Sequence, residues 1–184
     1  PWWCGLEWHQ DTPGYHGLGY YNQQNAARLD RIVDRARRES IYLCIETANH
    51  GPLSTHIDWQ WDRNPLNRRH PGGFLRYATD FFHSSRAQEL HRRRLRYTVA
   101  RWGYADSIAS WGVMTETEWN EAYFRGFPWP PPHELHGRAF APTPYRTPEH
   151  REAVRRWLVE TGRYLRDADT QDRKSTRLNS SHYS

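Results

Sequence analysis

Residues 101–116, RWGYADSIASWGVMTE, hold a helix end, a strand and an acidic residue in close succession. Gly103 is typical of a residue that ends a helix. The run over residues 108–114 is mostly apolar, which favours a buried strand. Glu116 follows this strand directly. The stretch therefore predicts a buried parallel strand with a carboxylic acid at its carboxyl end.

Two further strand-like runs precede it, over residues 2–8 (WWCGLEW) and 41–45 (IYLCI). The second does not alternate, which favours a strand buried on both faces. A helix is expected between them, over residues 22–40, because apolar residues recur there at helical spacing. These residues are Ala26, Leu29, Ile32, Val33 and Ala36.

A second helix is expected to begin near Ser85, which has capping-box spacing to Gln88, and to end at Gly103. A third is expected after Thr147 as cap and Pro148 as first helical residue. The predicted inward residues are Leu90, Leu95, Val99 and Trp102 in the second helix, and Val154, Trp157, Leu158, Thr161, Tyr164 and Leu165 in the third.

The predicted order is strand, helix, strand, helix, strand, helix, with long loops after the strands. Repeating units of this kind predict an α/β fold with parallel strands. Long loops at the carboxyl ends of strands are where (β/α)8 barrels build their active sites. A closed barrel takes eight units and about 250 residues, so this chain predicts a partial TIM barrel. A doubly wound sheet is the alternative, but no Gly-rich phosphate-binding turn follows any predicted strand.

The two ends of the sequence indicate a partial gene product. Residues 172–182, DRKSTRLNSSH, resemble a translated sequencing-library adapter, and Lys174 is the only lysine in the chain. A polar disordered tail is the alternative interpretation. Because the chain also begins with Pro1, we expect residues 1–170 to be an internal fragment of one catalytic domain. Residues 171–184 are expected to be an artefactual, disordered tail.

Charge and hydropathy restrict the classes of partner. The formal net charge is +5, of which residues 172–182 carry +2 (three basic residues less one acidic), leaving +3. This mild excess does not support a nucleic-acid partner. The basic run over residues 92–96 (RRRLR) is expected on the outer face of the second helix. No apolar run reaches the ~18–20 residues that span a bilayer, so no membrane partner is expected.

The aromatic and cysteine content adds two expectations. The chain has 10 Trp and 11 Tyr, a load that suits stacking on sugar rings, although a core can also absorb it. Cys4 and Cys44 lie in strand-like segments and are expected to be buried free thiols rather than a disulfide. No signal peptide is visible, and a secreted or periplasmic location of a full-length protein stays open.

Residues 101–116 resemble the segment that ends the fourth barrel strand of family 5-type glycoside hydrolases, the cellulase- and mannanase-like enzymes. That family pattern is approximately RWG-Y-x-x-x-I-x-A-W-E-L-x-N-E, and its last Glu is the acid/base. Aligned from Trp102 without a gap, the family's Glu falls on Glu116. A weaker likeness covers most of residues 1–170. The resemblance therefore implies strands two to four of the barrel with their helices.

The family uses a retaining mechanism, in which one glutamic acid protonates the glycosidic oxygen and a second carboxylate attacks the anomeric carbon. The resemblance implies hydrolysis of a β-linked polysaccharide or oligosaccharide, with Glu116 as general acid/base. The family's nucleophile lies on strand seven, which this chain lacks, so we expect the chain alone to be inactive. Glu118 lies beyond the strand end, and Asn120 with Glu121 lies too far along the chain.

The surroundings of Glu116 support and qualify this assignment. Met114, Trp111 and Trp119 flank it and are expected to form the apolar surroundings that keep such an acid protonated. Thr115 stands where the family has an Asn that binds the sugar 2-hydroxyl, and Gly112 replaces a family Glu. A hydroxyl does not reproduce the paired hydrogen bonds of an amide.

Further substrate-binding candidates follow the predicted strands. His50 resembles a family position that lines the cleft, although a hydrogen-bonded loop residue is the alternative. Trp59, Trp61 and Trp129 lie in the loops, where sugar stacking and loop packing are equally expected. Glu7, and more weakly Glu46, are expected to face the cleft.

Other chemistries have little support in the sequence. His133 and His136 are suitably spaced for zinc, but no third ligand is near them, so no metal or cofactor is expected. No G-x-S-x-G elbow is present for a serine nucleophile. Two hypotheses remain: a fragment of a retaining glycoside hydrolase, or a non-catalytic carbohydrate-binding relative with the same barrel. Both have a carbohydrate as partner.

Overall fold

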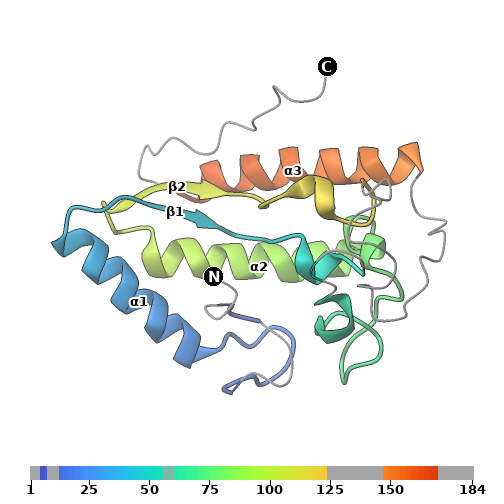
Figure 1. Ribbon diagram of the computed structural model, residues 1–184, viewed down its shortest axis with the longest axis horizontal. Coiled ribbons are helices and arrows are strands. Elements are labelled where there is room, and N and C mark those ends of the chain that lie inside the picture. Colours follow the sequence, from blue (N-terminus) through green and yellow to red (C-terminus); the bar gives the residue numbers. More distant parts are fainter. Residues whose placement is uncertain (1–4, 8–12, 56–57, 59, 124–146, 170–184) are drawn as a thin grey trace, which may run out of the picture.

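The computed structural model describes residues 5–7, 13–55, 58, 60–123 and 147–169, which form a mixed α/β structure. Three α-helices and two β-strands alternate along these residues, with short 3-10 helices in the loops (Figure 1). The bounds are Gln23–Arg38 for α1, Leu43–Glu46 for β1, Ser85–Trp102 for α2, Ile108–Gly112 for β2 and Pro148–Ala168 for α3.

The two strands pair in parallel, and α2 connects them as a βαβ unit. Glu46 at the end of β1 pairs with Gly112 at the end of β2. The carboxyl ends of both strands therefore lie at one edge of the sheet. Figure 1 shows α2 and α3 running alongside the strands. The predicted α/β class and the parallel pairing are confirmed for this part of the chain.

The sheet has one covered face and one open face. Leu43 and Ile45 of β1 pack against the core, whereas Cys44 and Glu46 are exposed. Side chains alternate along a strand, and the register places Cys44 opposite Ser110 and Glu46 opposite Gly112. We define the open face by these four residues. Among the described residues, the helices cover only the other face.

The prediction that residues 41–45 are buried on both faces was wrong. Ile41 and Tyr42 are 50% and 75% exposed, and the strand begins only at Leu43. The expected burial of Cys44 was also wrong, because its free thiol lies on the open face. An apolar run is buried on both faces only where a second layer covers it, and the described residues supply one layer.

The helices bury most of the residues in the stripes that the sequence predicts, but Ile32 of α1 and Leu90 of α2 are only partly buried. In α1, Ala26, Val33 and Ala36 are buried, and Leu29 packs at the core edge. In α2, Leu95, Val99 and Trp102 are buried; in α3, Val154, Trp157, Thr161 and Leu165 are buried. Arg92, Arg93 and Arg96 are exposed on α2, as expected. Arg94 differs, because it turns inward and forms an ion pair with Glu7 at 3.4 Å.

Two of the predicted helix ends are confirmed and one is corrected. The Thr147 hydroxyl accepts the His150 backbone N–H, and Pro148 is the first residue of α3. Gly103 caps the end of α2. The N-cap of α2 is Ser84 rather than Ser85, because the Ser84 hydroxyl accepts the Ala87 backbone N–H. Ser84 caps the helix although Ala87, not a Glu or Gln, stands three residues after it, so the capping-box spacing indicated the wrong serine.

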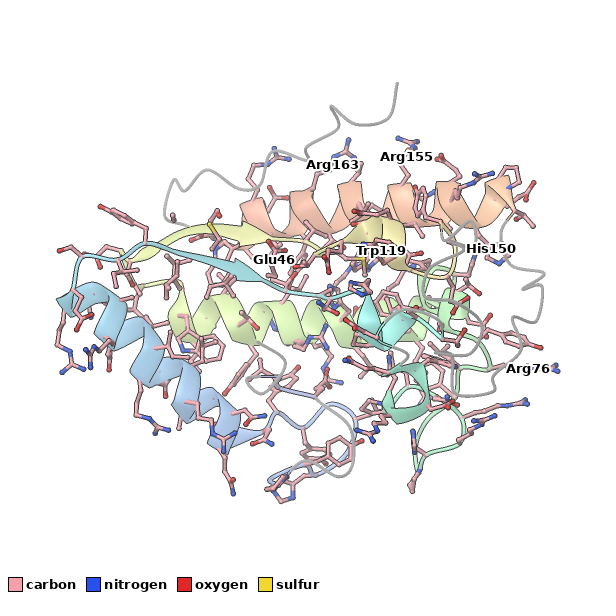
Figure 2. All side chains as sticks on the ribbon, in the orientation of Figure 1. Glu46, Arg76, Trp119, His150, Arg155 and Arg163 are labelled. Carbon is pink, nitrogen blue, oxygen red and sulfur yellow. The ribbon has the colours of Figure 1, made fainter. Side chains whose placement is uncertain are left out.

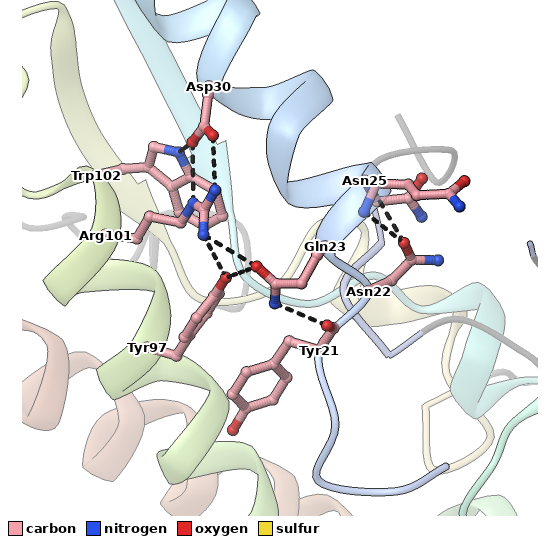
Figure 3. A network of polar contacts seen from close by, with 9 residues as sticks. Tyr21, Asn22, Gln23, Asn25, Asp30, Tyr97, Arg101 and Trp102 are labelled. Atoms are coloured by element: carbon pink, nitrogen blue, oxygen red, sulfur yellow. Dashed lines mark hydrogen bonds and ion pairs between the residues drawn. The ribbon is translucent and has the colours of Figure 1, made fainter. Parts of the chain in front are cut away.

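Helices α1 and α2 are joined by a network around Asp30 (Figure 3). The guanidinium of Arg101 donates to both Asp30 oxygens, at 3.0 and 2.6 Å. The indole N–H of Trp102 donates to the same carboxylate at 2.8 Å. These hydrogen bonds, the Arg101 contact foremost, lower the pKa of Asp30 below its usual value. Arg101 and Trp102, the first two residues of the stretch over 101–116, therefore hold α2 against α1.

The long segment after β1 is folded rather than extended. It contains the 3-10 helices η2 (Gly51–Leu53), η3 (Gln60–Arg63) and η4 (Ala78–Phe82). Leu53, Trp61 and Leu75 are each at most 5% exposed and belong to the core. This segment therefore builds a fixed wall beside the carboxyl ends of the strands.

Several expectations concern residues that lie wholly or partly outside the described parts. Of the strand expected over residues 2–8, only Gly5, Leu6 and Glu7 are described, and they form a turn rather than a strand. Cys4, the HELH histidines and the adapter-like tail lie outside the described residues. None of the described helices is both long enough and apolar enough to cross a membrane.

Candidate functional site

The loops that follow β1 and β2 are bound to each other at the carboxyl edge of the sheet. Asn49 and Thr115 form an isolated parallel bridge, and the Thr115 backbone N–H donates to Ala48 O at 3.2 Å. The Thr47 hydroxyl lies 2.9 Å from Gly112 O. These contacts extend the parallel pairing beyond the strands and bring the residues after Glu46 next to those after Gly112.

Glu116 lies at this edge, just after β2. It is the residue before the 3-10 helix η5 (Thr117–Trp119) and has φ 52°, in the left-handed region. A non-glycine residue in that region is uncommon and is destabilised by about 1–3 kcal/mol. Its side chain is 54% exposed. The backbone therefore holds a strained acid at the strand end, with its carboxylate accessible to solvent.

His50 connects the Glu116 carboxylate to a second acid. The imidazole is only 2% exposed, with Nδ1 3.3 Å from Glu116 Oε2 and Nε2 3.3 Å from Asp58 Oδ2. Asp58 also has a positive φ, 55°. Neither ring nitrogen makes a hydrogen bond of good geometry to the residues that the structure describes. A buried imidazole between two solvent-accessible carboxylates is thus the centre of the candidate site.

The short turn around His50 explains its burial. The Asn49 side chain accepts the Gly51 backbone N–H at 2.8 Å, and Leu53 N–H donates to His50 O at 2.8 Å. A Cβ at Gly51 would lie 2.9 Å from Gln60 Oε1 and 3.1 Å from Asp58 Cβ, so a larger residue here would have to displace these side chains. The turn therefore directs the ring inward between the loops rather than outward to solvent.

Glu46 supplies another carboxyl group, on the open face of the sheet (Figure 2). Although the residue as a whole is exposed, its carboxyl group lies directly over the backbone of Gly112. A Cβ at Gly112 would come within 2.0 Å of Glu46 Oε2. Burial of the carboxyl raises the pKa of Glu46, and a hydrogen bond from the Thr115 side chain partly offsets this.

Two of the candidates predicted to line the cleft have structural roles. The Glu7 side chain is 7% exposed, accepts the Gly19 backbone N–H at 2.8 Å and pairs with Arg94. Trp61 is 5% exposed and packs in the core, so neither face of its ring is free for a sugar. The packing alternative is therefore the one observed for Trp61. Trp59 and Trp129 lie outside the described residues.

The expected apolar surroundings of Glu116 are incomplete. Trp111 is fully buried on the covered face, where its indole N–H donates to Asp169 at 2.7 Å. Met114 and Trp119 are half-buried. Trp111 therefore packs towards the end of α3, on the face opposite to that of Glu46.

Of the later acids in the β2 loop, Glu121 differs from Glu116 in being buried. Glu121 is 4% exposed, and its Oε1 accepts the backbone N–H and the hydroxyl of Thr55. Asn120 is fully buried and accepts the Ala122 backbone N–H. Glu118 is exposed. Glu121 thus fixes the β2 loop to the loop after β1, and Asn120 stabilises the β2 loop itself, which agrees with their assignment to the loop.

Sequence reasoning missed Asp58 and undervalued Glu46. No local pattern identifies Asp58, since the turn around His50 alone brings it to the ring. The sequence did contain a signal for Glu46. An acid ends β1, and the paired position in β2 is a glycine, which leaves room for the acid's side chain. Among the described residues, no group of three or more His, Cys, Asp or Glu is placed to hold a metal ion.

A separate pocket of about 460 Å³ lies between η4, the start of α2 and the first half of α3. Its wall includes His83, Gln88, Glu149, Arg156 and Trp157. It contains none of the residues that the sequence predicts for the site.

The comparisons with known proteins add no family. No family model matches the chain, and no curated protein matches it either.

Proposed function

We propose that the chain is part of a retaining glycoside hydrolase that cleaves a β-linked polysaccharide or oligosaccharide, with Glu116 as general acid/base. The observation that carries the proposal is the contact between Glu116 and His50. An accessible carboxylate at a strand end lies 3.3 Å from a buried imidazole supplied by the neighbouring strand's loop. Catalytic groups of (β/α)8 enzymes come from the ends of different strands in this manner.

Each residue has a distinct role in this proposal. Glu116 donates a proton to the glycosidic oxygen and later takes one from water. His50 orients the Glu116 carboxylate, and Asp58 on the far side of the ring holds the imidazole in place. A second carboxylate, about 5–5.5 Å from the first, attacks the anomeric carbon. The proposal assigns that nucleophile to a strand beyond this chain.

The open face supports a larger barrel. Strands in a (β/α)8 barrel carry helices on one face only, and their other face points into a layered interior. Here the described helices cover one face of β1 and β2, and Cys44 and Ser110 lie on the other. A two-stranded sheet with an uncovered face and exposed Ile41 and Tyr42 fits a segment that packs against further strands.

The test is hydrolysis by the complete gene product on a panel of β-linked polysaccharides. Glu116→Gln keeps the side-chain volume but removes the transferable proton, so we expect turnover to fall by a factor of about 10² to 10⁴. Glu118→Gln is the matched control, since Glu118 is an exposed acid of the same loop. Unchanged turnover in Glu116→Gln would refute the acid/base assignment.

A non-catalytic carbohydrate-binding protein is the second candidate, and one observation favours it. Thr115 stands where the family that residues 101–116 resemble has an Asn, and a single hydroxyl does not reproduce the N–H donor of that amide. A site without that donor binds the transition state less tightly. Binding of oligosaccharides by the complete gene product without any hydrolysis would decide for this candidate.

A further inference from the structure

The start of α3 is packed against the end of η4 through two histidine rings. His83 follows η4 directly and His150 is the third residue of α3, and their ring centroids lie 4.9 Å apart in an edge-to-face arrangement. His150 Nδ1 is also 2.9 Å from the hydroxyl of Thr147, the N-cap of α3. Figure 2 shows His150 at this end of the helix. Two imidazoles therefore meet where the two elements join.

The position of both rings disfavours a positive charge. His150 lies in the first turn of α3, and His83 immediately precedes Ser84, the N-cap of α2. The N-terminus of a helix carries a partial positive charge, which repels a cation. Two charged imidazoles at this distance would also repel each other. The contact therefore suits neutral rings and is weakened when both rings gain a proton.

Charged groups of both elements act on His150. Asp80 of η4 and Glu149 of α3 favour a charge on the ring, whereas burial and His83 disfavour it. Burial is the largest of these causes, and the balance lowers the pKa of His150 below its usual value. The two acids therefore reduce the effect but do not reverse it.

The pocket between η4, α2 and α3 gives solvent access to the pair. Its wall combines His83 with Ser85 and Gln88 of α2 and with four charged residues of α3, namely Glu149, Glu152, Arg156 and Glu160. Glu152 pairs with Arg155 at 2.7 Å, and Glu160 lies 3.7 Å from Arg92. Two of the three acids in the wall thus already have a cationic partner.

A third imidazole beneath the pair responds to acid in the same direction. His91 of α2 is 3% exposed, and its ring packs against Phe81 and Trp157 with centroids 5.8 and 5.3 Å away. Its Nδ1 lies 2.8 Å from a guanidinium nitrogen of Arg94, which can only donate, so the ring is neutral. Burial, followed by Arg94 and Arg92, lowers the pKa of His91 well below its usual value. The aromatic contact between α2, α3 and η4 therefore also requires a neutral histidine.

We propose that the His83–His150 pair is a pH-sensitive contact, which holds the start of α3 on η4 near neutral pH and releases it in mild acid. The Tyr123 hydroxyl donates to Arg151 O at 3.2 Å, which connects the β2 loop to the same turn of α3. Release of this turn would loosen the end of the loop that also carries Glu116. The inference does not rest on the proposed function, because it concerns only how these elements are held together.

The direction of the effect follows from the lowered pKa of His150. A histidine whose folded pKa lies below its unfolded value of about 6.5 binds a proton more readily in the unfolded chain. Stability is therefore lost as pH falls from about 6.5 towards the folded pKa. For an imidazole that stays neutral in the folded chain, the folding equilibrium constant falls about tenfold between pH 7.5 and 5.5. Ordinary carboxyl groups titrate near about pH 4, below this window.

The test is hydrogen exchange of the 184-residue chain at pH 7.5 and 5.5, followed by mass spectrometry and expressed as protection factors. We expect protection over residues 148–158 of α3 to fall at least about threefold more than over residues 23–38 of α1, which contain no histidine. In the double variant His83→Gln with His150→Gln, this difference between the helices should shrink, because glutamine gains no charge. His16→Gln replaces an exposed histidine outside the junction and should behave as wild type.

The single variant His83→Gln guards against a loss of folding in the double variant, since His83 is exposed. It removes one of the two charges that repel each other, so the fall in α3 protection should be smaller than in wild type. An equal fall in α1 and α3, or no fall in α3, would overturn the inference. So would a full wild-type fall in His83→Gln or in the double variant.

Discussion

Two acids of the candidate site, Glu116 and Asp58, have backbones in the left-handed region, where a side chain is destabilising. Both lie against the same buried ring, that of His50. Strained residues that persist at one place in a fold are typical of functional sites. The strain at Glu116 is therefore an observation in favour of a role for its side chain.

This strain can be measured by comparing glycine with alanine at one position. Glu116→Gly and Glu116→Ala both remove the carboxylate, but only glycine relieves a φ of 52°. We expect Glu116→Gly to be about 1 kcal/mol more stable than Glu116→Ala in urea unfolding. Glu118 is the control, because its φ is not positive and the order of the two variants should reverse there. Equal stabilities at position 116 would show that the backbone is unstrained.

The hydrogen bond between Thr115 and Glu46 is testable through ionisation. It stabilises the Glu46 carboxylate, whereas burial raises the pKa of that group. Thr115→Val removes the hydroxyl and keeps the volume, so we expect the pKa of Glu46 to rise further. A carboxyl ¹³C NMR titration measures it. Thr117→Val is the control, since the Thr117 hydroxyl contacts Met114 O instead. An unchanged or lower pKa in Thr115→Val would mean that this bond is absent in solution.

At the scale of elements, the sequence predicts the helices and their buried faces, but it does not predict which faces of the strands are covered. The stripe with Val154, Trp157 and Leu165 is encoded locally, since residues three and four apart share one helix face. The burial of Tyr42 depends on whether another layer covers it, which no local pattern contains. Trp61 is a similar case, because an aromatic residue in a loop stacks on a ligand or packs in the core according to how the loop folds.

The contact between α1 and α2 gives a prediction at this scale. Asp30→Asn removes a charged acceptor of hydrogen bonds from Arg101 and Trp102, so we expect a loss of about 1–2 kcal/mol in unfolding free energy at pH 7. Because the folded pKa of Asp30 is lowered, its contribution is present above the unfolded pKa and is lost as pH falls through the folded pKa. The difference between wild type and variant should therefore shrink on acidification to pH 2.

Urea unfolding at the two pH values measures this dependence on Asp30. Asp34→Asn is the matched control, because Asp34 lies one turn further along α1 and its side chain is exposed. A difference for Asp30→Asn that stays constant down to pH 2 would contradict the assignment of the stabilisation to the ionised carboxylate.

At the scale of the whole molecule, the candidate site was only partly predictable from the sequence. Glu116 and His50 follow strands, and parallel strands bring their carboxyl ends to one edge, so their proximity could be expected. Asp58 reaches His50 only because the turn at Gly51 reverses the chain. The Glu46 carboxyl group lies over Gly112 because β1 and β2 pair in one particular register. Such contacts depend on three-dimensional pairing that spacing in one strand does not reveal.

The open face leads to a prediction for the chain as a whole. If Glu116 acts with a nucleophile from a strand beyond this chain, then the purified 184-residue chain has one of two required carboxylates. In that case we expect this chain alone to show no measurable hydrolysis of β-linked polysaccharides. The uncovered sheet face and exposed Ile41 and Tyr42 should also make the chain bind a hydrophobic dye more strongly than the complete protein. Turnover by the chain, absent in its own Glu116→Gln variant, would instead place a complete catalytic site within these residues.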